Sequence, residues 1–559
     1  MGAEGTVPVR NPPLRRGRGH RVSGPRPLYW LGGVAALVVG LPLALILGAW
    51  LQPETEVWRH LAETVLDDLI VNTLVLVAGV GVGVVVLGVG LAWLTAVCEF
   101  PGRRFFDWAL MLPLAVPTYV LAFVALGLLD FDGPVQAWLR RLVGSDAPQL
   151  FEIRTPAGVI GVMVLVLYPY VYLLARSAFI TQGAGSLEAA RLLGLGPWGT
   201  FFRVALPMAR PAIVAGTSLA LMEALADFGA VAVFNYDTFT TAIYKAWFGL
   251  FNLHAASQLA SLLLVFVAAV LALERWTRGR ARYAEAGRSR RLHRHRLSGA
   301  HRWLAASAAA LVFLAAFGAP LVQLLVWAWA AWAEGMDARY PALVGHTLAL
   351  GAMAALCTAA VALGLAYLQR GAGFWGRVLV RVATLGYALP GSVLAVGVML
   401  AFTRLDAWVE PLWRWAAVDP APLLAGSLGA LVVAYLIRFM AVAHGALDSG
   451  LARIRPNLAE AARSLGARRL EVLRRVHLPL LQPALFSALL LVLVEVMKEM
   501  PATLLLRPFG WDTLAVRIYE LTSEGEWQRA ALPSVTLVLV GLIPVVLLVR
   551  RSAARERAP

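Results

Sequence analysis

The stretch EAARLLGLGPWGTFFRVALPMARP, which begins at Glu188, recurs in altered form as EAARSLGARRLEVLRRVHLPLLQP, which begins at Glu460. Each copy contains Glu-Ala-Ala, a glycine six residues after the glutamate, and a Leu-Pro pair whose proline lies thirteen residues after that glycine. Both copies lie at the same place in two long apolar halves of the chain. This arrangement indicates a duplicated protein that presents two equivalent hydrophilic loops.

Composition places the chain among polytopic membrane proteins. Hydrophobic residues make up 60% of the 559 residues, charged residues make up 15%, and the mean hydropathy is +0.71. Crossing a hydrocarbon core of about 30 Å takes about 20 helical residues. Apolar runs of sufficient length predict twelve spans, near 28–50, 71–97, 105–129, 157–180, 209–232, 254–274, 303–332, 344–369, 378–403, 424–447, 482–506 and 531–550.

Further segments repeat with nearly the same offset as the loops. NTLVL at Asn72 matches HTLAL at His346, and YDTFTTAIY at Tyr236 matches WDTLAVRIY at Trp511. We therefore predict an all-α polytopic membrane protein in which two homologous six-helix halves correspond span for span. The expected organisation is a basic N-terminal arm at 1–27, a first repeat at 28–274, a basic linker at 275–302, a second repeat at 303–550 and a tail at 551–559.

Arginine predicts the orientation, because Lys and Arg concentrate on the cytoplasmic flanks of membrane helices. If the N-terminal arm is inside, the even-numbered connections are inside as well, and these connections carry basic clusters, among them 275–302. Both termini and both repeated loops are then cytoplasmic. The net charge of +16 lies beside spans, where topology and anionic lipid explain it, so we expect the lipid bilayer and no nucleic acid as a partner.

The repeated loop has a physical interpretation of its own. Ser186 or Gly185 can begin a helix whose first turn holds Glu188, where the helix dipole favours a carboxylate. Gly194 and Gly466 can adopt left-handed backbone angles and end that helix. We expect a second short helix, parallel to the membrane, that ends where Pro207 or Pro479 returns the chain to the bilayer.

These loops resemble the EAA signature of permease subunits in bacterial binding-protein-dependent ABC importers of type I, which have the MetI-like fold. The resemblance implies a multi-pass protein of the bacterial inner membrane that works with a periplasmic solute-binding protein and two ABC ATPase subunits. It assigns ATPase docking to Glu188, Ala189, Ala190, Gly194, Glu460, Ala461, Ala462 and Gly466. Two fused halves and the stretch LPLAVPTYVLAFVALGLLDFDGP resemble ferric iron permeases, although permeases for thiamine and other small solutes look similar.

The chain lacks the lysine that nucleotide binding requires. Its two lysines, Lys245 and Lys498, follow Tyr and Met, so neither belongs to a Gly-Lys-Ser/Thr phosphate loop. We expect no cofactor and no catalysed covalent step in this chain, with ATP hydrolysis on a partner subunit. The rival hypothesis is a duplicated secondary transporter driven by an ion gradient.

Four carboxylates lie inside predicted spans. Glu223 and Asp227 are four residues apart on one helical face, and Glu495 and Glu499 occupy the matching positions of the second half. Ionisable groups at this depth often mark a transport pathway, and a hard cation favours their oxygens. The alternative is structural ion pairing, with Lys498 or Arg438 as the partner. Metal binding by these carboxylates stays a hypothesis.

Two aromatic segments are candidates for contact with the receptor. The segment 234–254 and its match at 508–527 lie on the predicted outer side, one in each half. One lobe of a two-lobed receptor could meet each half, and the alternative is that the aromatic residues only anchor the protein at the membrane interface. The candidate residues are Tyr236, Asp237, Tyr244, Trp511, Asp512 and Tyr519.

Overall fold

The computed structural model is a bundle of long helices. It describes residues 26–51, 55–143, 152–181, 189–190, 192–278, 294–332, 336, 338–371, 373–415 and 424–557. Within these ranges eleven helical segments are long and apolar enough to cross a membrane. The helix α26 supplies a further apolar stretch, Trp527–Ile543, where the twelfth span is expected. The predicted all-α polytopic fold is confirmed.

The elements of the first half run from α1 to α13, and those of the second half run from β2 to α26. The first contains α1 (Arg26–Gly48), η1 (Ala49–Leu51), α2 (Thr55–Thr64), α3 (Leu66–Val97), β1 (Cys98–Glu99), α4 (Arg103–Ala109), η2 (Leu112–Ala115), α5 (Thr118–Leu129), α6 (Pro134–Val143), α7 (Pro156–Thr181), α9 (Pro197–Thr200), η3 (Phe201–Ala205), α10 (Leu206–Ala226), α11 (Gly229–Val233), α12 (Phe239–Tyr244), η4 (Lys245–Gly249) and α13 (Leu253–Arg278). The second contains β2 (His295–Arg296), α14 (Ala300–Phe313), η5 (Leu314–Gly318), α15 (Ala319–Ala330), α17 (Tyr340–Gly371), α18 (Phe374–Ala383), η6 (Leu385–Ala388), α19 (Gly391–Trp415), α20 (Leu428–Ala452), α21 (Pro456–Ser464), α22 (Arg469–Val472), η7 (Leu473–His477), α23 (Leu478–Lys498), α24 (Pro501–Leu506), α25 (Leu514–Ser523) and α26 (Trp527–Arg557).

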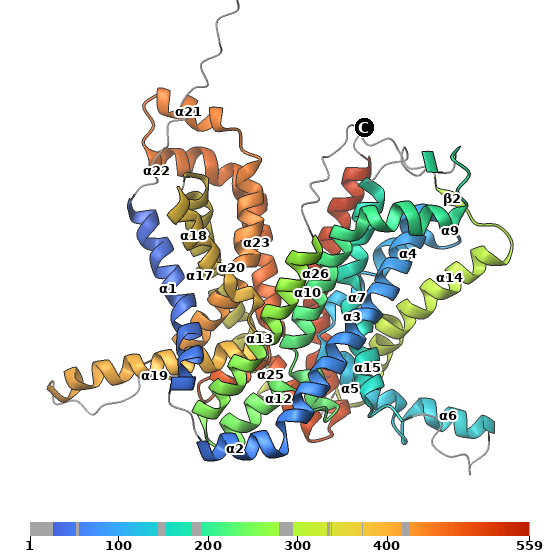
Figure 1. Ribbon diagram of the computed structural model, residues 1–559, viewed down its shortest axis with the longest axis horizontal. Helices are drawn as coiled ribbons and strands as arrows, with labels where there is room; N and C mark the ends of the chain where they lie inside the picture. Colours follow the sequence, from blue (N-terminus) through green and yellow to red (C-terminus); the bar gives the residue numbers. More distant parts are fainter. Residues whose placement is uncertain are drawn as a thin grey trace, which may run out of the picture.

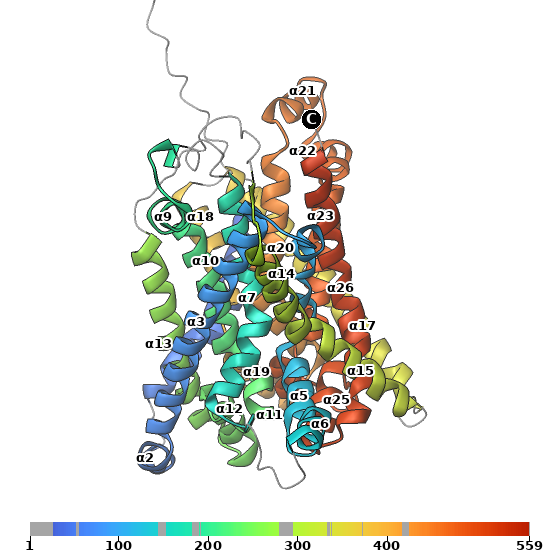
Figure 2. The same ribbon diagram turned by 90° about the vertical axis from the view of Figure 1, so that its right-hand side faces the viewer.

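The two repeated loops lie at the same end of the bundle. Figure 1 shows α9 of the first loop and α21 and α22 of the second near the end where α26 finishes, whereas α2, α6 and α12 lie at the opposite end. The view turned by 90° in Figure 2 shows the same separation. The loops could therefore be reached from one side of a membrane.

Four of the expected spans are broken inside the bundle, which corrects the sequence prediction of continuous helices. The expected span 105–129 is divided into α4, η2 and α5, and 378–403 is divided into α18, η6 and α19. Pro117 and Pro390 lie just before α5 and α19, where the missing N–H prevents the helix from continuing. Hydropathy does not detect such breaks, since the flanking side chains remain apolar.

The fifth and eleventh spans break at their carboxylates. The first break falls between α10 and α11 at Asp227 and Phe228, and the second falls between α23 and α24 at Glu499 and Met500. The backbone at both carboxylates is extended, with ψ of 131° at Asp227 and 112° at Glu499. Discontinuous helices at matching places in two repeats often surround a transport site.

The second arm of each repeated loop also differs from expectation. No separate helix ends at Pro207 or Pro479, because α9, η3 and α10 follow one another without a gap, as do α22, η7 and α23. The stretches η3 and η7 are π-helical, and the amide of Leu206 bonds to the carbonyl of Phe201. This wider turn accommodates the proline ring, which would otherwise clash with the carbonyl four residues earlier.

The first span of each half packs on the other half, an exchange that the repeat pattern did not reveal. Helix α1 packs against α17, α18 and α19, and Figure 1 shows it beside them. In the same way α14 packs against α4 and α15 packs against α5 of the first half, while α15 also packs against α26 of its own half. The halves are interlocked, so neither would bury its apolar surface completely alone.

Strand pairing attaches the described end of the linker to the first half. Strand β2 pairs in parallel with β1, so Cys98 lies opposite His295 and Glu99 lies opposite Arg296. His295 is exposed, while His293 and most of the basic linker lie outside the described residues. Helix α14 begins at Ala300, slightly before the expected start of the second repeat.

Glycines on α3 permit close packing against α7. A Cβ at Gly88 would lie 2.8 Å from the Val171 Cβ and 3.0 Å from the Tyr168 carbonyl oxygen. No atom lies within 4 Å of a Cβ placed at Gly90, which is exposed. The close approach that glycine permits between helices therefore depends on particular positions.

Replacing Gly88 by valine should force α3 and α7 apart and destabilise the protein by about 1–3 kcal/mol, the usual cost of overpacking. The measurement is the thermal unfolding midpoint of the purified protein in detergent. Gly90→Val is the matched control and should unfold near the wild-type temperature. Equal losses in the two variants would contradict the packing described here.

Candidate functional site

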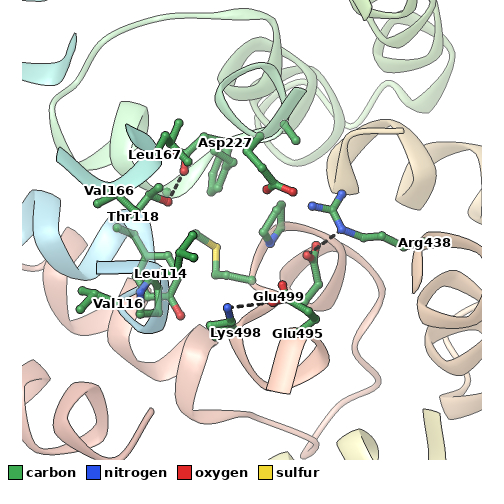
Figure 3. Close-up of a pocket in the computed structure, with 18 of the residues that line it drawn as sticks. Leu114, Val116, Thr118, Val166, Leu167, Asp227, Arg438, Glu495, Lys498 and Glu499 are labelled. Atoms are coloured by element: carbon green, nitrogen blue, oxygen red, sulfur yellow. Dashed lines mark hydrogen bonds and ion pairs between the residues drawn. The ribbon is translucent and has the colours of Figure 1, made fainter. Parts of the chain in front are cut away.

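The four predicted carboxylates line one cavity between the halves. Its volume is about 120 Å³, and its lining comes from α5, α7, α10, α20, α23 and the breaks that follow α10 and α23. Figure 3 shows Asp227 on one side of this space and Glu495, Lys498, Glu499 and Arg438 on the other. The structure thus brings together groups that are more than 250 residues apart in the chain.

Asp227 and Glu499 cap the short helices that follow them. The Ala230 amide donates to Asp227 Oδ1 at 2.8 Å, and the Ala502 amide donates to Glu499 Oε1 at 3.2 Å. The Thr118 hydroxyl also donates to Asp227. Because backbone groups inside a bilayer need internal partners, each carboxylate stabilises the break at which it lies.

The second-half carboxylates also form ion pairs. Arg438 Nε lies 3.0 Å from Glu499 Oε2, and Arg438 Nη1 donates to the Leu389 carbonyl at 2.9 Å. Lys498 Nζ lies 3.0 Å from Glu495 Oε1. The ion pairs proposed from the sequence are present, and that of Glu499 is nearly inaccessible, with side-chain exposures of 5% and 11%.

Among the described residues of the first half, Glu223 and Asp227 form no matching ion pairs. Glu223 accepts a long hydrogen bond of 3.4 Å from the Tyr387 hydroxyl. Helices α7 and α20 are related by the same offset as Glu223 and Glu495, and that offset places Val166 where the second half has Arg438. Both residues are labelled in Figure 3. The halves therefore share a backbone and differ in charge.

The space around each capping carboxylate also differs between the repeats. Gly391 lies at the position in α19 that Thr118 occupies in α5. A Cβ at Gly391 would collide with Glu499 Oε1. The longer Glu499 is thus matched by a glycine, whereas the shorter Asp227 is matched by a hydroxyl donor.

The two repeated loops share their backbone geometry. Gly194 has φ +84° and Gly466 has φ +88°, which confirms the predicted left-handed helix ends. The amide of Leu195 bonds to the Ala190 carbonyl at 3.1 Å, and the amide of Ala467 bonds to the Ala462 carbonyl at the same distance. Such bonds satisfy carbonyls at a helix end and hold the chain in a sharp bend.

The remaining loop candidates are placed as follows. Glu188 lies outside the described residues, Ala189 is exposed, and Ala190 is buried. Glu460 and Ala461 are exposed on α21. That helix begins at Pro456, so Glu460 lies in its second turn and the helix-dipole argument made for Glu188 does not carry over to Glu460.

The outer candidates mainly hold the local structure together. The Tyr236 hydroxyl donates to the Asn72 carbonyl at 2.9 Å, and Asp237 accepts from Lys245 Nζ at 2.6 Å. In the second half Trp511 stacks on His346 at 4.6 Å between ring centroids.

The other three outer candidates are also engaged. Tyr519 contacts Phe228 and Tyr244, and Asp512 pairs with Arg507 at 2.5 Å. Burial raises the pKa of Tyr519 to about 12. The six side chains are all buried or half-buried. Their contacts fix the ends of α12 and α25 relative to α3 and α17.

Sequence reasoning missed several groups at these sites. Thr118, Tyr119, Tyr170 and Tyr387 line the cavity. Tyr387 and Thr118 lie within the repeated segments YALPGSVLA and LAVPTYVLA, and the prolines there were the available signal for a broken helix beside a site.

The fold and the site define a duplicated multi-pass permease. The family model described as "Binding-protein-dependent transport system inner membrane component" matches residues 85–283 and 359–525. The chain belongs to this family, and it is accordingly a subunit of a transport system. The two matches confirm the expected duplication.

Individual relatives agree with the family. The chain is 27% identical to the "Fe(3+)-transport system permease protein FbpB 2" of Haemophilus influenzae, over 94% of this chain and 98% of that protein. It is 24% identical to the "Ferric transport system permease protein FbpB" of Actinobacillus pleuropneumoniae, over 88% of this chain and 72% of that protein. The "Sulfate transport system permease protein CysW" of Escherichia coli is 33% identical over 36% of this chain and 67% of that protein.

Replacing Arg438 by methionine should destabilise the protein by about 3–5 kcal/mol, because it leaves Glu499 charged, buried and unpaired. The measurement is resistance to unfolding in mixed detergent micelles. The double variant Arg438→Met with Glu499→Gln should recover part of the loss. Lys498→Met should cost about 1 kcal/mol or less, since its partner Glu495 is 41% exposed. Equal losses in the two single variants would contradict this.

Proposed function

We propose that this chain is the inner-membrane permease subunit of an ABC importer that translocates ferric iron. The observation that carries the proposal is the pair of loops with matching left-handed glycines, in a chain similar over 94% of its length to an Fe(3+)-transport permease. The size of the cavity also favours an ion. About 120 Å³ is well below the roughly 300–1,000 Å³ of pockets for organic ligands such as thiamine.

The proposed topology places both termini in the cytoplasm. The repeats then occupy 28–274 and 303–550, joined by the basic linker 275–302 and flanked by the arm 1–27 and the tail 551–559. The distribution of arginine supports this orientation, with the repeated loops on the inner side.

Two ABC ATPase subunits would each dock on one repeated loop. In the first half the chain is helical from Pro197 to Ala226, a length of about 45 Å. This helix joins the Gly194 bend to Glu223 and the break at Asp227, and α22, η7 and α23 make the same connection in the second half. Movement of a docked ATPase would thus shift the cavity lining directly.

A periplasmic binding protein would dock at the opposite end. The ends of α12 and α25 carry the receptor candidates, one set in each half. Because those six side chains make contacts within the permease, the receptor would bind the surface that they support. Phe251 and Phe509, which are 89% and 106% exposed, extend from this surface.

The four carboxylates would line the translocation path. ATP binding would draw the loops together and open the cavity toward the docked receptor, and hydrolysis would return it to an inward-facing state. The breaks at Asp227 and Glu499 are the points at which the fifth and eleventh spans can bend.

Reconstitution tests this function against the ion-gradient alternative. In proteoliposomes with its ATPase and its iron-loaded receptor, the permease should take up ferric iron only when ATP is supplied. Omitting either partner should abolish uptake. Transport by the permease alone under a proton or sodium gradient would contradict the proposal, as would ATP-dependent uptake of thiamine without iron.

Substituting Gly194 or Gly466 by valine should lower ATP-dependent uptake by about fivefold or more, because a Cβ at positive φ costs about 1–2 kcal/mol and straightens the bend. Gly196→Val is the matched control in the same loop. Gly196 has φ −65°, and no atom lies within 4 Å of its Cβ position. Unchanged ATP-dependent uptake by the Gly194→Val variant would show that the bend does not couple the subunits.

A further inference from the structure

We propose that the first-half side of the cavity, formed by Glu223, Asp227 and Tyr119, is a transient binding site for a hard multivalent cation. The second-half carboxylates instead form ion pairs with Arg438 and Lys498 of the chain itself. This inference rests on the proposed function and assigns the cargo contact to one of the two halves.

Charge is the first argument. Glu495 and Glu499 each have a Lys or Arg nitrogen within 3.0 Å. Glu223 and Asp227 form no ion pair with any part of the chain that the structure describes. Arg438 attracts the Glu223 carboxylate electrostatically, but the two side chains are not in contact. The carboxylates of the cavity that are not held in a close ion pair are therefore on the first half, and a cation entering the cavity would be attracted there.

Tyr119 provides the second, independent argument. Its side chain is 5% exposed and lines the cavity, and its hydroxyl has no hydrogen-bond partner among the described residues. A buried hydroxyl without a partner costs about 1–3 kcal/mol. A phenol oxygen beside carboxylates is the kind of oxygen donor that a hard cation binds. A cation seated between Asp227 and Tyr119 would satisfy the hydroxyl.

The site is suited to releasing a bound cation rather than storing it. No group of three or more His, Cys, Asp or Glu side chains within the described ranges could hold a metal ion. Two carboxylates and one phenol would leave the remaining ligand positions to water. The cavity of about 120 Å³ has room for an ion and a few waters of about 30 Å³ each.

The donors also come from elements that can separate. Tyr119 lies in α5, Glu223 lies in α10, and Asp227 lies at the break after α10. Bending at that break would change the distance between Asp227 and Tyr119. The cation would then be released by the same movement that opens the path.

Terbium is a suitable probe, since Tb3+ is a hard trivalent cation whose luminescence is sensitised by nearby aromatic rings. The full-length permease in nanodiscs should bind Tb3+ saturably. Glu223→Gln with Asp227→Asn should weaken binding by about tenfold or more, because two charges are lost. Tyr119→Phe should weaken it by about threefold without lowering the unfolding temperature.

The matched arm is Glu495→Gln in the second half, which should weaken Tb3+ binding by no more than about twofold, because Lys498 already occupies that carboxylate. Glu223→Asp preserves the charge and should bind within about threefold of wild type. Equal weakening by Glu223→Gln and Glu495→Gln would overturn the assignment, and so would wild-type protein without saturable binding.

Receptor-dependent uptake of ferric iron, measured with the same preparations, separates this inference from the proposed function. Tb3+ binding that depends on Glu223, in a system that takes up no iron, would support the cation site and overturn the iron cargo. If iron is taken up but Tb3+ binding is unaffected by the substitution of Glu223 and Asp227, the assignment of the cation site is overturned and the proposed function is not. Gel filtration of every variant identifies those that fail to fold.

Discussion

The helix breaks at Asp227 and Glu499 are the constraint on which the interior depends. A break inside a bilayer exposes amides that cannot bond to water, so each break needs a partner within the protein. The following amides at Ala230 and Ala502 donate to the two carboxylates. Once a carboxylate is placed there, its charge must be stabilised as well, and that requirement shapes the surrounding helices.

The two repeats meet this requirement differently. In the second half Arg438 neutralises Glu499, and Gly391 leaves room for the longer side chain. In the first half a threonine hydroxyl donates to the shorter Asp227, and valine replaces the arginine. Duplication preserved the backbone, while divergence left the negative charge on one side of the cavity. A symmetric framework thereby holds an asymmetric site.

The same helices connect this interior to the surface. The helix that contains Glu223 starts just after the Gly194 bend, and the helix that contains Glu495 starts just after the Gly466 bend. The π-helical stretches keep these helices continuous through a proline. The first span of each half also packs on the other half, so displacement of one half acts on its partner. In the proposed function, coupling and translocation would therefore depend on the same helices.

The sequence by itself determined the helical class, the duplication and the glycine bends, because apolar length, repeat spacing and the left-handed preference of glycine are local properties. It also identified the four carboxylates, since charge in an apolar run is rare. Only the tertiary structure decided where the spans break, which half each first helix packs on, and that Arg438 and Lys498 neutralise the second half alone. Those features depend on contacts between residues far apart in the chain, and hydropathy contains no information about them.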